Sequence, residues 1–206
     1  MQTRQIKCKL TSTIRDLYSY NLWRTNLLYN CLRTNIENDE NFFNILLNDE
    51  GWYLKSIKAT LNHIVAADIL YYLRLYELNE VQISKNNFTT KEISELWNSN
   101  KFEGFIDDKE NMQWFENINK LHLEVNHKYR NSIDDLIEKE NFEFFYKDFN
   151  FYDTKGDKKT SPRHLSFIHV ISHATHHLGQ ITAILSKYKI QKYPEMVLSY
   201  TFNLKL

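Results

Sequence analysis

Residues 172–180 read Ser172-His173-Ala174-Thr175-His176-His177-Leu178-Gly179-Gln180, and four of the eight histidines lie between His169 and His177. No Pro or Gly interrupts residues 163–178. Ser161-Pro162 just before them is a typical helix start, because Ser caps the first turn and Pro fits into it. The stretch therefore predicts a helix from Pro162 to Tyr188.

The histidines of this helix divide between two of its faces. At about 100° per residue the apolar positions form one stripe, made of Phe167, Val170, Ala174, Leu178, Ile181 and Leu185. His177 lies about 50–60° from the stripe centre and His173 lies at its edge, whereas His169 and His176 project further toward the opposite side. His173 and His177 are one turn apart, a spacing at which two neutral imidazoles can share a metal ion. The alternative is a polar helix edge whose histidines are solvated or hydrogen-bonded.

Composition and charge favour a helical protein without a nucleic-acid partner. The 206 residues fit one domain, residues 1–206, and 42% apolar residues can form its core. Only four Gly and two Pro favour long helices over a turn-rich β fold. Lys+Arg and Asp+Glu both number 26, so the formal net charge is zero. No sustained basic stripe supplies the concentrated positive charge that phosphate binding needs.

The chain also lacks signals for export or a membrane. Cys8 and Cys31 are far apart and form no CxxC pattern, which indicates a reducing compartment. The first residues contain no long apolar run, and no segment reaches the roughly 18 apolar residues of a membrane span. We therefore expect a cytoplasmic protein with no membrane partner.

Three more helices are predicted from their apolar spacing and caps. They cover Ile14–Ile36 after a polar lead of residues 1–10, Ile57–Leu78 with Ser56 as N-cap, and Asp107–Lys139. Four long helices without an internal repeat predict an all-α bundle.

The segments between these helices are predicted to be less regular. Residues 35–44 are polar and predict a loop or a frayed helix end. Residues 81–104 predict an irregular excursion with one short helix, and the tail after Pro194 predicts another. Aromatic and polar residues partly alternate from Phe142 to Tyr152 before a turn at Gly156, which predicts a short hairpin or extended arm before the last helix.

Asp68 lies within the apolar stripe of the second helix, and His63 lies about 100° from the centre of that stripe. A carboxylate on such a face needs a partner, since an unpaired buried charge is costly. It can form a core-edge salt bridge, bond a Tyr hydroxyl, or hold the second ring N–H of a metal-ligand histidine. His122 and His127 do not share a face well, and we expect both at the surface or the core edge.

Four segments resemble the DinB-like family of four-helix bundles. Ser56-Ile57 with Thr60-Leu61-Asn62-His63-Ile64 is similar to the family's Ser-Ile start followed by Thr-Leu-x-His-Ile. Residues 169–181 resemble its last-helix motif, His-Val-x-x-His-x-x-His-His-Arg-Gly-Gln, and residues 20–26 and 194–200 are similar to further family segments. The resemblance is weak from Asn79 to Asp157.

The resemblance implies an up-down-down-up-type four-helix bundle with a divalent metal ion, nickel or zinc, held by His63, His173 and His177. Asp68 matches a position where the family often has an acid, which makes it a candidate to support a ligand. Leu178 departs from the family's Arg and removes a cation expected beside the site. The resemblance also implies a homodimer.

An open three-histidine site suggests several functions. The closest model within the family is a metal-dependent thiol transferase that acts on a small-molecule electrophile. The alternatives are a metal-dependent hydrolase, a non-enzymatic metal-binding or stress-response bundle, and a protein-interaction bundle with an aromatic surface.

Overall fold

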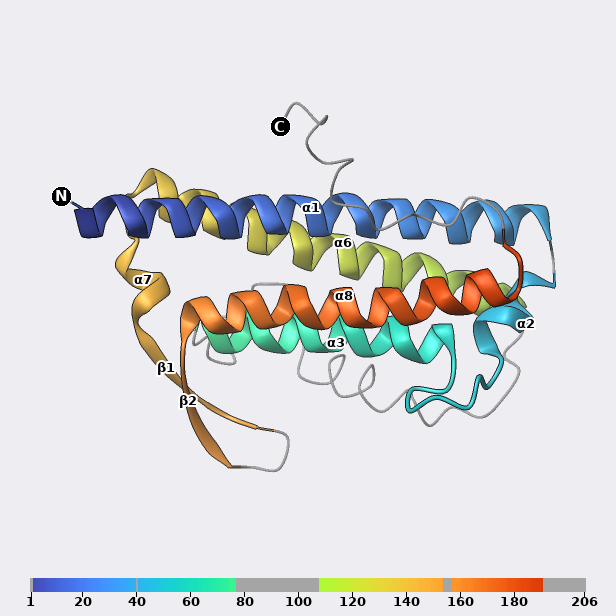
Figure 1. Cartoon of the computed structure of the whole chain (residues 1–206). Coiled ribbons are helices and arrows are strands. Elements are labelled where there is room, and N and C mark those ends of the chain that lie inside the picture. Colours follow the sequence, from blue (N-terminus) through green and yellow to red (C-terminus); the bar gives the residue numbers. More distant parts are fainter. Residues whose placement is uncertain (1, 40, 77–107, 154–156, 191–206) are drawn as a thin grey trace.

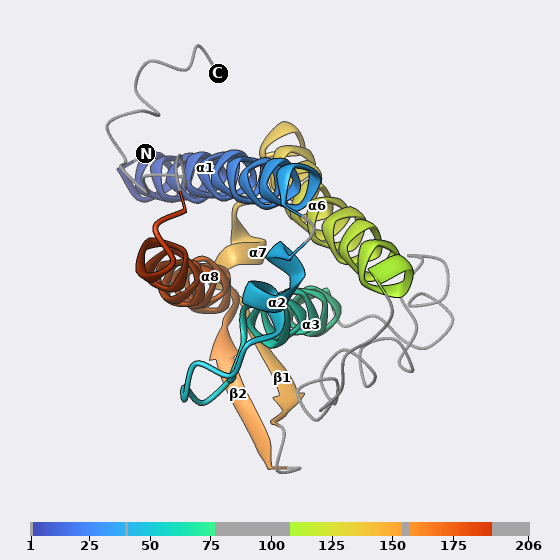
Figure 2. The same cartoon turned by 90° about the vertical axis from the view of Figure 1, so that its right-hand side faces the viewer.

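The computed structural model describes residues 2–39, 41–76, 108–153 and 157–190. Its four long helices confirm the all-α class. They are α1 (Gln2–Asn38), α3 (Ile57–Leu75), α6 (Asp108–Glu138) and α8 (Arg163–Lys187). Seen end-on they form a closed ring, in which α1 packs on α6, α6 on α3, α3 on α8 and α8 on α1 (Figure 2). In Figure 1, α1 and α8 run in one direction and α3 and α6 in the other. No helix in the described parts of the chain combines the length and apolar character of a membrane span.

Aromatic rings fill much of the core between the four helices. The stripe predicted for the last helix is confirmed, because all six of its members are buried. Tyr18 of α1 stacks on Tyr129 of α6 with ring centroids 4.8 Å apart, and the edge of Phe167 of α8 meets Tyr18 at 5.9 Å. These rings join three helices through area burial and favourable ring geometry.

A two-stranded antiparallel hairpin precedes α8, where the sequence predicts an excursion. It consists of β1 (Asp148–Tyr152) and β2 (Lys158–Pro162), with Asp148 paired to Pro162 and Tyr152 to Lys158. The prediction placed its first strand from Phe142, but residues 143–146 form a short helix, α7 (Glu143–Tyr146), with Phe145 buried in the core. The predicted turn at Gly156 lies outside the described residues.

Arg163 fastens this hairpin to the bundle. Its guanidinium is buried and donates through Nε to the carbonyl of Leu75, the last residue of α3, at 3.0 Å. Its backbone N–H donates to the carbonyl of Lys147 at 3.2 Å. The first amide of α8 is thus satisfied across the hairpin, so the predicted N-cap at Ser161 is wrong, and Ser161 lies in β2.

The start of α3 follows the prediction. The Oγ atom of Ser56 accepts the backbone N–H of Ala59 at 3.1 Å, which is the N-cap interaction expected from the sequence. This cap fixes the start of α3, and His63 lies less than two turns further along the helix.

Two other helical segments differ from the prediction. Helix α1 begins at Gln2 and not at Ile14, because no Gly or Pro interrupts residues 1–13 and the Thr11 side chain is buried in the bundle. Helix α2 (Phe42–Leu47) overlaps the predicted loop of residues 35–44, and it forms because Phe42, Phe43 and Leu46 are buried against the core. The predictions for residues 81–104 and for the tail after Pro194 lie outside the described residues.

Candidate metal centre

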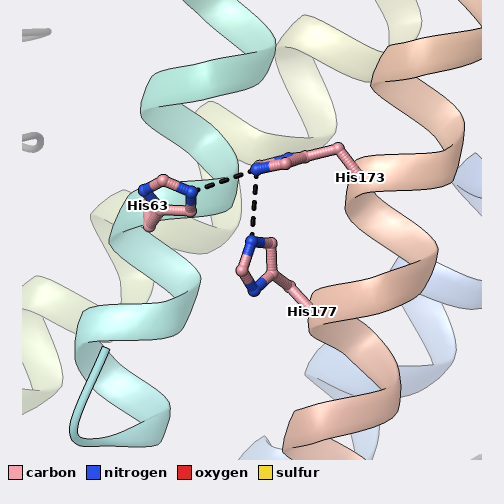
Figure 3. A group of neighbouring side chains, drawn as sticks. All are labelled: His63, His173 and His177. Carbon is pink, nitrogen blue, oxygen red and sulfur yellow. Dashed lines mark hydrogen bonds between the residues drawn. The ribbon is translucent and has the colours of Figure 1, made fainter. Parts of the chain in front are cut away.

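Three histidines from two helices meet at the interface of α3 and α8. Nε2 of His63 lies 3.0 Å from Nε2 of His173, and Nε2 of His177 lies 3.2 Å from that same atom (Figure 3). One ligand atom from each ring lies within 4.8 Å of the other two. The structure therefore brings together the three residues that the sequence motifs singled out.

Helical geometry and packing explain this convergence. His173 and His177 are one turn apart on α8, so their side chains leave the same face of the helix. Their ring centroids are 4.5 Å apart. His63 reaches them only because α3 packs against α8, across 110 residues of sequence. His177 is buried, and His63 and His173 are half-buried, so the cluster lies at the rim of the core.

The environment keeps all three rings neutral at pH 7. Burial lowers the pKa of His63 to about 4, with a further contribution from His177. Burial and the four surrounding histidines lower the pKa of His173 to about 3, and burial also lowers the pKa of His177. A metal ligand must offer a lone pair, so these shifts prepare the rings to bind a cation without first losing protons.

Gln180 determines which nitrogen of His177 faces the cluster. Nδ1 of His177 lies 2.7 Å from the side-chain oxygen Oε1 of Gln180. An amide oxygen only accepts hydrogen bonds, so Nδ1 carries the proton and Nε2 of the neutral ring presents its lone pair. Gln180 was not predicted as a site residue, although its position one turn after His177 on the same helix was a signal for this contact.

The donor set fits a divalent transition-metal ion. Metal–nitrogen bonds of about 2.0–2.1 Å place the ligand atoms of a tetrahedral or octahedral ion about 2.9–3.4 Å apart. The Nε2 atom of His173 lies 3.0 Å from that of His63 and 3.2 Å from that of His177, both within this range, and all three ligand atoms lie within 4.8 Å of one another. Imidazole nitrogen suits zinc and nickel, and three protein ligands leave at least one coordination position open.

The remaining histidines of α8 lie outside the triad. His169 and His176 are exposed, in agreement with the helical-wheel prediction. The ring of His169 packs against Tyr71 of α3 at 4.9 Å, and the ring of His176 lies 4.9 Å from that of His177. His164 uses Nδ1 to bond the carbonyl of Phe145 at 3.0 Å.

Asp68 faces a different histidine from those of the triad. Its Oδ2 atom lies 3.5 Å from Nε2 of His122 on α6, and both side chains are fully buried. The prediction that His122 lies at the surface or core edge is therefore wrong, because pairing with a buried acid draws it into the core. His127 is exposed, as expected.

Burial dominates the electrostatics of Asp68. It raises the pKa of the carboxyl group, and His122 and Arg24 act in the opposite direction. Nδ1 of His122 lies 3.2 Å from the hydroxyl of Tyr29, so His122 bridges α1 and α3 from its position on α6. Asp68 thus belongs to a polar cluster inside the bundle, and it is not placed to support the ligand histidines in the way that the sequence analysis considered.

Arg24 is a second buried charge that the sequence analysis did not single out. Its guanidinium donates to Thr175 Oγ1 at 2.6 Å and to the carbonyl of Ile171 at 3.2 Å, both on α8. Asn21 also accepts from it, at 2.9 Å through Nε. Arg24 of α1 therefore holds α8 at Ile171 and Thr175, while His173 and His177 of the same helix contact α3 and each other. The polar residues inside the otherwise apolar spacing of α1 were the available signal.

Leu178 is fully buried in the core. The departure from the family motif therefore places an apolar side chain inside the bundle and adds no cation at the metal centre.

Comparison with known proteins identifies one family. The model of the DinB family matches residues 7–188, which is most of the chain. No curated protein and no solved structure matches the chain. The match spans all three histidines of the candidate metal centre and the helices α3 and α8 that carry them.

Proposed function

Because the chain belongs to the DinB family, we propose that it is a metal-dependent enzyme that transfers a low-molecular-weight thiol to an electrophile. The observation that carries the proposal is that one nitrogen from each of three neutral imidazoles lies within 4.8 Å of the other two. Family membership and this site together support a metal-binding protein. We propose nickel or zinc as the ion, because both accept imidazole ligands.

The residues of the chain have separate roles in this proposal. His63, His173 and His177 would hold the ion, and Gln180 would keep Nε2 of His177 free of a proton. The bound ion would supply Lewis acidity that lowers the pKa of a thiol at an open coordination position. In the transfer, the thiol proton passes to solvent and the sulfur forms a bond to the electrophilic carbon. The leaving group departs with the electron pair of the bond that breaks.

A thiol suits this site better than water does. Among the described residues, the group that could hold an ion consists of three histidines and contains no carboxylate. It therefore offers no carboxylate as a general base for water. Asp68 is committed to His122 inside the core. A free thiol has a pKa of about 8.5, far closer to neutrality than that of water, and it needs much less activation.

The test is an assay of protein with measured metal content. Apo protein is loaded with nickel or zinc and supplied with cysteine, 2-mercaptoethanol or 3-mercaptopropionate and with 1-chloro-2,4-dinitrobenzene as electrophile. We expect turnover in the loaded wild type, loss in His63→Ala, and retention in His176→Ala, which changes an exposed neighbour of the triad. Metal-loaded protein that turns over none of these thiols would argue against a transferase.

The structure also favours a second candidate, a metal-binding bundle without catalysis. The triad joins α3 to α8 across 110 residues of sequence, so a bound ion would contribute folding free energy directly. In that case metal would raise the melting temperature of the wild type, and no thiol would bind to the loaded protein. Thiol titration of the loaded protein therefore separates the two functions.

A further inference from the structure

Tyr71 and His169 continue the row of rings that begins at the metal centre. His169 precedes His173 by one turn on α8, and Tyr71 follows His63 by two turns on α3. Because α3 and α8 run in opposite directions (Figure 1), these positions come level, and the two ring centroids are 4.9 Å apart. The ring of His169 lies 5.8 Å from that of His173. The pair thus adjoins the triad along the α3–α8 interface.

The polar groups of Tyr71 and His169 can form hydrogen bonds with a bound molecule. His169 is exposed and Tyr71 is half-buried. Within the part of the chain that the structure describes, the hydroxyl of Tyr71 and the ring nitrogens of His169 make no hydrogen bond. The buried hydroxyls of Tyr18 and Tyr129, by contrast, each donate to a backbone carbonyl. Tyr71 and His169 therefore offer free donors beside the metal centre.

Arg74 is a cation beside this pair, and the carboxylate of Asp153 is close enough to act on its pKa. The guanidinium carbon of Arg74 lies 5.6 Å from the centre of the Tyr71 ring, and Arg74 is held in place by donating to the carbonyl of Tyr152 at 2.6 Å. The nearby Asp153 forms an ion pair with Lys159 at 3.6 Å. A divalent ion on three neutral histidines keeps its full charge, so the surface from the triad to Arg74 favours an anion.

We propose that Tyr71 and His169 form a subsite for the carboxylate of a thiol substrate whose sulfur lies at the metal centre. This inference rests on the proposed function and names the substrate class, a short thiol carboxylate. In such a thiol the sulfur lies about 4–5 Å from the carboxylate by standard bond lengths. Together with a metal–sulfur bond of about 2.3 Å, that reach is long enough to span the 5.8 Å between the ring centroids of His173 and His169, so one molecule could contact the ion and the pair at once.

Two probe thiols that differ only in charge test the subsite. 3-Mercaptopropionate carries the carboxylate, and 3-mercaptopropionamide is its neutral counterpart of the same length. Each is titrated into protein loaded with Co²⁺, and binding is followed by the cobalt absorption spectrum and by calorimetry. A hydrogen bond to a charged group corresponds to about tenfold in affinity or more, so we expect the wild type to prefer the carboxylate at least that strongly.

The variants assign the preference to residues. Tyr71→Phe removes only a hydroxyl, and His169→Ala removes an exposed ring, so both should bind cobalt with wild-type stoichiometry. We expect each to reduce the preference severalfold, and the double variant to abolish it. His176→Ala is the matched control, an exposed histidine of the same helix that should leave the preference unchanged.

The outcomes separate this inference from the proposed function. Equal affinity of the wild type for the two thiols would overturn the subsite and leave the thiol transferase standing. A preference that survives in the double variant would also overturn it. Failure of both thiols to bind the cobalt-loaded wild type would remove the proposed function and the subsite together.

Discussion

Replacing His63 by Ala should remove most of the stabilisation of this protein by metal. The ligands of α8 are one turn apart, but His63 lies 110 residues away from His173 in sequence. Closing a loop of that length costs about 4 kcal/mol in chain entropy, so the unfolded chain is a poor three-ligand site. Almost all the binding free energy of the third ligand should therefore appear as stability of the folded state.

The size of the effect follows from mass action. At a metal concentration of about 100 times Kd, binding to the folded state alone adds about 2.7 kcal/mol. For a chain of this size, about 1 kcal/mol corresponds to about 2–4 °C in melting temperature, so the wild type should gain about 5–11 °C. If the loss of His63 weakens binding about 100-fold, the remaining gain is about 0.4 kcal/mol, or about 1–2 °C.

The assay is differential scanning calorimetry of metal-stripped protein with and without a fixed excess of NiCl₂ or ZnCl₂. Without metal, His63→Ala should melt within about 2 °C of the wild type, because the side chain is only half-buried and substitutions of this kind cost little. His176→Ala should keep the full metal-dependent shift. A full shift in His63→Ala, or an equal loss in His176→Ala, would refute a site that depends on the third ligand from α3.

Three further predictions follow from the same structure. Gln180→Leu should weaken metal binding about 10–100-fold, because His177 loses the acceptor that holds its Nδ1 proton; an unchanged Kd in a competition titration against a metal indicator would contradict this role. Burial and neighbouring histidines lower the pKa of His173 to about 3, so the unfolded state binds a proton there more readily than the folded state. Metal-free protein should therefore lose stability as pH falls from about 6.5 toward 3. Urea unfolding at several pH values should show a shallower loss of stability in His173→Gln. Burial raises the pKa of Asp68, so its charge is costly, and Asp68→Asn should be close to neutral or stabilising at pH 7. Asp68→Ala should cost about 1–3 kcal/mol, because it leaves the buried Nε2 atom of His122 without a polar neighbour. Equal unfolding free energies for the two variants would exclude this account.

Local patterns predicted the parts of the fold that depend on local interactions. The stripe from Phe167 to Leu185 is buried as its spacing predicted, and Ser56 caps α3 as its residue type predicted. Helix α2 shows the limit of such patterns. The polar residues around it indicated a loop, but Phe42 and Phe43 are buried against the core. Side-chain burial in the assembled bundle outweighs weak local propensity over so short a segment.

The candidate metal centre divides in the same way. The i,i+4 spacing of His173 and His177 follows from the helix alone, since residues one turn apart share a face in any helix. The family motifs then selected His63, but neither spacing nor composition fixes a distance across 110 residues. Only the packing of α3 on α8 brings the His63 ring within 3.0 Å of His173.

The amino-acid sequence by itself determined the helical class, the buried stripe of the last helix and the orientation of two of the three histidines, because each depends on neighbours within one or two turns. The tertiary structure decided which polar residues share the interior. It paired Asp68 with His122, buried Arg24 against α8, and left Tyr71 beside His169 at the metal centre. These partners come from different helices, and their contacts are set by how the helices pack and not by any spacing along the chain.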